Sequence, residues 1–127
     1  MNANSKIVLA TVAGVAIGAA ATHGLHAQTK LKAYSVGELE VTGTLPSDYL
    51  PTARKAIEAA HGHALRTVNG RVVSIEGAPP PKNVALVEWD SVDDALAFYK
   101  SKAWTDLAPQ REKAQKTIRR YVVEVEK

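Results

Sequence analysis

The stretch NVALVEWDSVDDALAFYKS, residues 83–101, carries the pattern that decides the fold. Its first seven residues are almost continuously apolar, and a run of this length is typical of a buried strand. Ser91 then precedes a segment in which Ala95 and Tyr99 recur at helical spacing. Asp94 stands three residues after the serine, as in a variant of the capping box that begins helices. The stretch therefore predicts a strand that leads directly into a helix.

Three further elements precede this stretch. KAYSVGELEVTG (32–43) is rich in strand-forming residues and predicts the first strand. LPSDYLPTARKAIEAAHGH (45–63) has apolar residues at helical spacing and predicts a helix that ends near its glycine. Asn69-Gly70 separates the β-rich runs 64–68 and 71–75. Because both turn residues of a tight hairpin need positive φ, this pair predicts that the second strand folds back or kinks there.

Two elements follow the opening stretch. Residues 103–116 predict a second, less regular helix that is broken near Pro109, and residues 117–126 predict the last strand. The three prolines 79–81 form a short, pre-extended connection between two strands. The order β-α-β-(β)-β-α-β is typical of a ferredoxin-like α+β fold, with an antiparallel sheet that has its helices on one face.

The face of the sheet away from the helices is expected to be half apolar. Tyr121, Val123 and Val125 share one side of the last strand, and the other side is mixed, with Ile118, Arg120, Val122, Glu124 and Glu126. Two helices cover only one face of a sheet, so a partner is expected on the other. A symmetric homodimer with its sheets face to face is the simplest arrangement that covers both.

The first 27 residues resemble a secretory signal peptide. A short start with Lys6 precedes the uncharged stretch 7–22, and small residues stand near its end at Ala21 and beyond it at Ala27. Cleavage is expected after Ala27, with Ala21 as the alternative. The uncharged stretch is shorter than the about 20 residues that cross a bilayer, although a retained anchor is the competing interpretation. We therefore expect a periplasmic or secreted domain over residues 28–127, which meets the membrane only through its leader.

Composition excludes several classes of protein. The chain has 127 residues, 46% hydrophobic and 23% charged, which is typical of one globular domain rather than a disordered chain. A net charge of +3 gives no support for nucleic-acid binding. The absence of cysteine excludes disulfides, thiolate metal sites and cysteine nucleophiles. No Ser-His-Asp order, P-loop, dinucleotide fingerprint or metalloprotease helix is present, so we expect no cofactor.

The segment EGAPPPKNVALVEWDSVDDALAFYKSKAWTDLAPQREKA (76–114) resembles the signature of the DUF1330 family. That resemblance implies a dimeric α/β barrel built from ferredoxin-like units, in a family without an assigned activity. The chain departs from the family pattern in two places: His63 stands where a second glycine is usual, and Leu45-Pro46 replaces Asp-Pro. The matching residues are Glu76-Gly77, Pro79 to Pro81, Glu88-Trp89, Ser91, Ala95, Phe98-Tyr99, Ser101, Trp104, Pro109 and Arg111.

The carboxylates of the central strands are candidates for acid–base chemistry. In the strand order 4-1-3-2, strands one and three are neighbours, so Glu38 and Glu88 are expected to approach each other. Two carboxylates in an apolar cleft raise one pKa and create a general acid or base. The alternative is that each glutamate forms a structural ion pair with an arginine of a flanking strand. The candidate arginines are Arg66, Arg119 and Arg120.

The remaining candidates are histidines, aromatic residues and arginines. His61 and His63 lack an evident third metal ligand, so no metal site is predicted, although His63 suits a general base near neutral pH. Tyr99 and Trp104 are expected to line a pocket. A run of basic residues is interpreted as a solvated face that attracts anions at most. That run comprises Arg111, Lys113, Lys116, Arg119 and Arg120.

Two functions remain open at this point, with a membrane-tethered interaction domain as a minor third. The first is an exported, dimeric module that binds a small anionic or apolar ligand or is purely structural. Its ligand-binding candidates are Glu38, Arg66, Tyr99, Trp104 and Arg120. The alternative is a cofactor-free enzyme, similar to oxygenases or isomerases, with Glu88 or His63 as the base. The only support for this enzyme alternative is the similarity of the expected fold to that of such enzymes.

Overall fold

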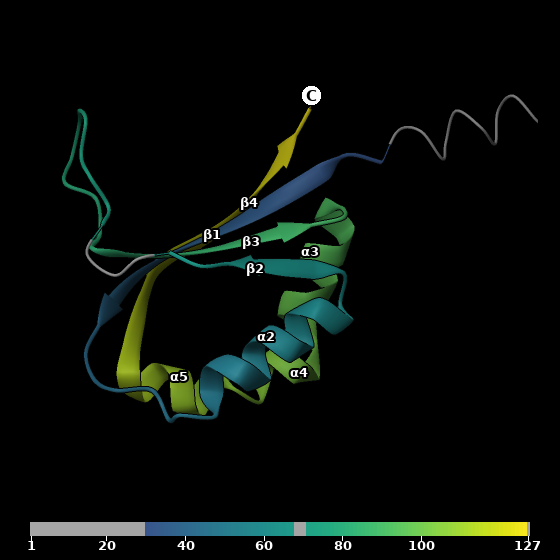
Figure 1. The fold of residues 1–127 in the computed structure, drawn as a ribbon, viewed down its shortest axis with the longest axis horizontal. Coiled ribbons are helices and arrows are strands. Elements are labelled where there is room, and N and C mark those ends of the chain that lie inside the picture. Colours follow the sequence, from purple (N-terminus) through teal and green to yellow (C-terminus); the bar gives the residue numbers. More distant parts are fainter. Residues whose placement is uncertain (1–29, 68–70, 127) are drawn as a thin grey trace, which may run out of the picture. The chain divides into compact units, whose positions relative to one another are not determined.

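The computed structural model of the chain describes residues 30–67 and 71–126, which form an antiparallel sheet with helices on one side (Figure 1). The four strands lie in the order β2-β3-β1-β4, so the predicted ferredoxin-like α+β architecture is confirmed. The predicted signal peptide, residues 1–27, lies outside the described residues. The elements are β1 (Lys32–Val41), α2 (Tyr49–Ala59), β2 (Gly62–Leu65), β3 (Asn83–Trp89), α3 (Val92–Lys100), α4 (Lys102–Thr105), α5 (Ala108–Ala114) and β4 (Gln115–Val125).

The strand register gives the sheet two different faces. Ala33 of β1 aligns with Trp89 of β3, and both are fully buried against the helices. Their neighbours Tyr34 and Glu88 align with each other one position along and point to the opposite side. We call that opposite side the open face. Within residues 30–67 and 71–126, no helix has the length and apolar composition to cross a membrane.

The core is organised around Trp89, whose side chain is 0% exposed. Phe98 of α3 packs against its indole, with ring centres 5.1 Å apart. The indole N–H donates to the Ser35 hydroxyl at 2.9 Å, and this hydroxyl also lies 2.7 Å from the Tyr99 hydroxyl. Burying an indole N–H without an acceptor costs about 1–3 kcal/mol. The bond to Ser35 avoids this cost, so Trp89 can occupy the centre of the core. Ser91, the predicted N-cap of α3, accepts from the Asp94 N–H at 3.2 Å.

The turn from α2 into β2 depends on two residues with different tasks. His61 takes the left-handed conformation that ends the helix, with φ 67°. Gly62 follows it and lies against the side chains of Ile57 on α2 and Trp89 on β3. A Cβ at Gly62 would lie 2.7 Å from Ile57 Cγ2 and 2.7 Å from Trp89 Cζ3. The glycine is therefore required for packing, while the histidine makes the turn.

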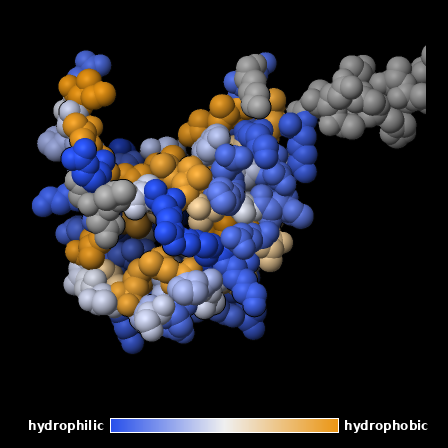
Figure 2. Space-filling view, in the orientation of Figure 1, coloured by the Kyte–Doolittle hydropathy of each residue, from blue (hydrophilic) through white to orange (hydrophobic). Residues whose placement is uncertain are grey.

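Two predicted elements differ from the structure. Arg71–Ile75 is not a strand, and the Asn69-Gly70 turn lies outside the described residues. The segment projects from the end of β2 on the side away from the helices (Figure 1), and its hydrophobic residues lie in solvent (Figure 2). Val73 is 71% exposed and Ile75 is 95% exposed. Strand propensity reflects packing on a half-buried surface, and this segment has no such surface.

The predicted irregular second helix consists of two helices, α4 and α5. They are separated at Asp106 and Leu107, just before Pro109, which occupies the first turn of α5. Proline lacks the N–H that a helix interior needs, so it is tolerated at a start and breaks a longer helix. The last strand begins at Gln115, directly after α5.

We expect Gly62→Ala to lower the free energy of unfolding by about 1–3 kcal/mol, because an added methyl group would overpack the core against Ile57 and Trp89. The midpoint of urea unfolding measures this loss. Gly37→Ala is the control, since the three atoms nearest to its added Cβ all belong to the movable guanidinium of Arg120, with Nη1 at 2.6 Å. Equal losses for the two variants would contradict the packing explanation.

Candidate functional site

The open face carries an apolar row that crosses all four strands. The register aligns Leu65 of β2, Leu86 of β3, Val36 of β1 and Tyr121 of β4. Leu65 and Tyr121 are exposed, and the two central residues are only half-buried. None of the described helices covers this row, so it is an apolar strip in contact with solvent.

Glu38 lies on the open face beside that row and binds an arginine. Arg119 of β4 aligns with it and donates from Nε to Oε2 and, at 2.9 Å, from Nη2 to Oε1. The hydrogen bonds from Arg119 hold the pKa of the Glu38 carboxyl below its ordinary value of 4.5. Glu38 is therefore a paired carboxylate rather than a general base. Glu38 therefore forms the structural ion pair that the sequence offered as the alternative to acid–base chemistry. Its partner is Arg119 rather than Arg66 or Arg120.

Glu88 also lies on the open face, but at a distance from Glu38. Glu88 aligns with Tyr34, four positions along β1 from Glu38, which places the two backbones roughly 13 Å apart. The Tyr34 hydroxyl donates to Glu88 Oε2 at 3.0 Å, and Lys32 Nζ lies 3.6 Å from Oε1. This hydrogen bond to Glu88 raises the pKa of Tyr34. The expected approach of the two glutamates does not occur, and a catalytic role for Glu88 stays a prediction.

Three of the predicted ligand-binding residues meet on the helix side of the sheet. The rings of Tyr99 and Trp104 stand edge to face, with centres 5.2 Å apart. The guanidinium carbon of Arg120 lies 5.0 Å from the centre of the Trp104 ring and 5.5 Å from that of Tyr99. Arg120 reaches them because it aligns with Gly37 on β1, where the missing side chain leaves room for the guanidinium.

Arg111 joins the same cluster from α5. Its guanidinium carbon lies 3.7 Å from the centre of the Trp104 ring, and Nη1 lies 3.4 Å from the Tyr49 hydroxyl. The residue is only 8% exposed. The interpretation of the basic run as a solvated face is therefore wrong for Arg111, whereas Lys113, Lys116 and Arg119 are exposed as expected. We call Tyr49, Tyr99, Trp104, Arg111 and Arg120 the arginine–aromatic site.

The electrostatics of the arginine–aromatic site are unbalanced. Among the described residues, no ion pair joins a carboxylate to Arg111 or Arg120. Contact with an aromatic face offsets part of the cost of burying a guanidinium, but it supplies no hydrogen-bond acceptor. The Tyr49 hydroxyl accepts a hydrogen bond from Arg111, but it carries no charge that would balance the guanidinium. The site is therefore suited to an anion that accepts from both guanidinium groups.

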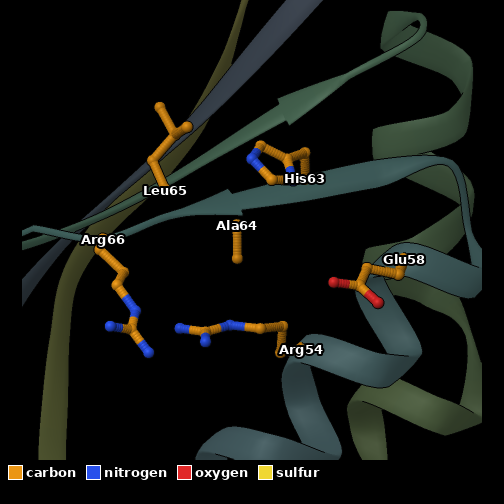
Figure 3. Close-up of a pocket in the computed structure, with 6 residues that line it drawn as sticks. All are labelled: Arg54, Glu58, His63, Ala64, Leu65 and Arg66. Carbon is orange, nitrogen blue, oxygen red and sulfur yellow. The ribbon is translucent and has the colours of Figure 1, made fainter.

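His63 and Arg66 lie elsewhere, around an open pocket at the edge of the sheet (Figure 3). His63 aligns with Glu88 and belongs to the open face, while Arg66 follows the end of β2. The pocket is lined by Arg54, Glu58, His63, Ala64, Leu65 and Arg66. Across the two described ranges, no group of three or more potential metal-ligating side chains occurs.

Sequence reasoning missed Arg111 as a site residue, although a signal for it exists. Leu107, Arg111 and Ala114 follow helical spacing, and all three are buried. An arginine flanked at that spacing by apolar residues lies on the inward face of a short helix. Tyr49 has a comparable signal, since it begins the buried face of α2 together with Ala53 and Ile57.

Comparison with known proteins identifies the fold and leaves the activity open. The family described as "Domain of unknown function (DUF1330)" matches residues 32–125. The solved structure of the RPA0582 protein of unknown function from Rhodopseudomonas palustris is similar, at 9% identity and a TM-score of 0.54, covering 83% of this chain and 89% of that one. The methylated RPA0582 protein aligns at 10% identity and a TM-score of 0.55, with coverage of 84% and 90%. No protein with a curated description matches the sequence.

We expect Glu38→Gln to weaken the dependence of stability on acid. Because the pKa of Glu38 is lowered in the folded state, its ion pair stabilises the fold above pH 4.5 and is lost as the pH falls through the lowered value. Urea midpoints measured from pH 6 to about pH 3 should fall less steeply in the variant. Glu40→Gln, at the exposed glutamate two residues along β1, is the control and should follow the native curve.

Proposed function

The chain belongs to the DUF1330 family, and from this premise we propose that it is an exported, dimeric protein that binds a small anionic ligand. The observation that carries the proposal is the pair of guanidinium groups on Trp104, to which the described residues bring no carboxylate. The family is defined without an activity, so the argument depends on the chemistry of this chain.

The arginine–aromatic site favours a ligand that has both a charged and a flat apolar part. Guanidinium groups bind carboxylates and phosphates through paired hydrogen bonds. Tyr99 and Trp104 present ring edges and faces to an aromatic or aliphatic body. Arg120 is half-buried and therefore accessible from solvent, so an incoming ligand would contact it first. A small organic acid fits this combination better than an inorganic ion does.

Dimerisation is supported by the composition of the open face. The apolar row consists of Leu65, Leu86, Val36 and Tyr121. It is removed from water only when another surface packs over it. The flanking charges already form ion pairs: Glu38 binds Arg119, and Lys32 lies 3.0 Å from Asp90 and 3.6 Å from Glu88. A charge that is paired costs less to bury than a single one. A second copy of the sheet, related by twofold symmetry, would cover the row and leave the arginine–aromatic sites outside the interface.

Export is supported by the sequence of the N-terminus. Residues 1–27 combine a basic start, a short apolar core and small residues at the cleavage position. A periplasmic or secreted location also agrees with a domain that contains no cysteine. Mass spectrometry of the protein recovered from the periplasm would locate the cleavage, and an uncleaved chain would contradict this part of the proposal.

We expect Arg120→Gln to weaken the binding of benzoate, used as a model organic acid, by roughly tenfold or more, since a hydrogen bond to a charged group is lost. Titration calorimetry on the full-length protein measures the dissociation constant. Gly37→Ala should also weaken binding, because its Cβ would displace the Arg120 guanidinium without changing any charge. Lys113→Gln is the control for net charge on the neighbouring helix and should bind normally.

Two outcomes would contradict the ligand proposal. Benzamide, which has the same ring without the charge, should not compete with benzoate; competition would mean that the ring alone is recognised. Equal binding by the native protein, Arg120→Gln and Arg111→Met would place the ligand elsewhere on the protein.

We expect Tyr121→Glu to convert the dimer into a monomer, because it would place an unpaired charge on the β4 end of the apolar row, inside the proposed interface. Light scattering coupled to gel filtration measures the mass. Tyr121 is 43% exposed within its own chain, so the monomer should still fold. Leu96→Glu on α3, at a residue 44% exposed, is the matched control and should leave the dimer intact. A native protein that is monomeric at every concentration would exclude the interface.

A further inference from the structure

The pocket at the edge of the sheet is built by two arginines from different elements. Arg54 and Glu58 lie one turn apart on α2, which runs beneath β2, and Arg66 follows the end of β2. In Figure 3 the guanidinium ends of Arg54 and Arg66 point toward each other into the space between strand and helix. Glu58 enters the same space from the opposite end of the pocket.

Among the described residues, neither of these two cations forms an ion pair, although Glu58 lines the same pocket. No ion pair within the described ranges involves Arg54 or Arg66, and the Nε atom of Arg54 is buried without a hydrogen-bond acceptor. Like charges that converge repel each other, and an unsatisfied buried donor adds a further cost. An oxyanion between them would remove both costs at once, because it accepts hydrogen bonds from each guanidinium.

The edge strand adds main-chain groups to the same pocket. β2 is an outer strand of the sheet. The Asp90 N–H donates to the His61 carbonyl at 3.2 Å, which makes these two a hydrogen-bonded pair of the ladder. Because such pairs alternate in an antiparallel ladder, His63 and Leu65 bond toward β3, and Ala64 directs its main-chain groups away from the sheet. Ala64 lines the pocket, so its outward amide lies at the edge of the space that the arginines enter.

We infer that this pocket is a second ligand site, which binds an oxyanion, a phosphate or carboxylate group, between Arg54 and Arg66 at the edge of β2. It is separate from the arginine–aromatic site, because the two sites share no residue, although α2 contributes Tyr49 to one and Arg54 to the other. The inference does not depend on the proposed function. Either site would remain if the other were shown to be empty.

The test is a titration of the full-length protein with inorganic phosphate, followed by NMR amide shifts of Ala64 and Leu65. A second titration with acetate distinguishes a phosphate from a carboxylate, and potassium chloride at equal ionic strength accounts for charge screening. The inference predicts saturable shifts with at least one of the two oxyanions and none with chloride. Shifts that do not saturate with either oxyanion would overturn it.

Matched variants locate the bound oxyanion. Arg66→Gln, at an exposed residue whose replacement leaves the core untouched, should weaken binding roughly tenfold or more, and Arg54→Gln should do the same. Lys55→Gln removes one charge from an exposed neighbour on α2 and should bind normally, as should Arg120→Gln in the other site. Equal weakening by Lys55→Gln would mean that net charge alone attracts the ion, and it would overturn the inference.

Discussion

The fold depends on satisfying one buried donor, the indole N–H of Trp89. This residue ends β3 and is fully enclosed, so its N–H must find an acceptor inside the protein. Ser35 of β1 supplies it, and the same hydroxyl meets that of Tyr99 on α3. One short chain of hydrogen bonds thereby ties two central strands to a helix. The indole also fills the space that Gly62 leaves open, which extends the same constraint to the turn between α2 and β2.

The position of the arginine–aromatic site follows from that constraint. Fixing Tyr99 through Ser35 orients its ring toward Trp104, and the two rings then form the surface on which Arg120 and Arg111 lie. The site is thus supported by the rigid core rather than by a loop. Side chains held by packing and hydrogen bonds lose little further entropy when a ligand binds. This support is a physical reason to regard the arginines as placed for binding.

Local patterns in the sequence predict most of the fold and less of the site. The strand–helix pattern of residues 83–101 and the cap at Ser91 depend on neighbours along the chain, and both are confirmed. The prediction of a strand at Arg71–Ile75 is wrong, because residues such as Val73 have strand propensity but no surface to pack on. The sequence offers three arginines as partners for Glu38 and cannot select Arg119 among them, because the partner depends on strand register. Register is set by tertiary packing.

The distribution of charge links the two faces of the sheet. On the open face, Glu38 is paired with Arg119, and Glu88 shares Lys32 with Asp90, so covering this face costs less than it would with isolated charges. The carboxylates used there are not available to the arginines on the helix side and at the edge of β2. An anion that approaches the protein is therefore attracted to the helix side and to the pocket at the edge. The ion pairs of the open face thus engage its carboxylates locally, and among the described residues they leave Arg54, Arg66, Arg111 and Arg120 without an ion-pair partner.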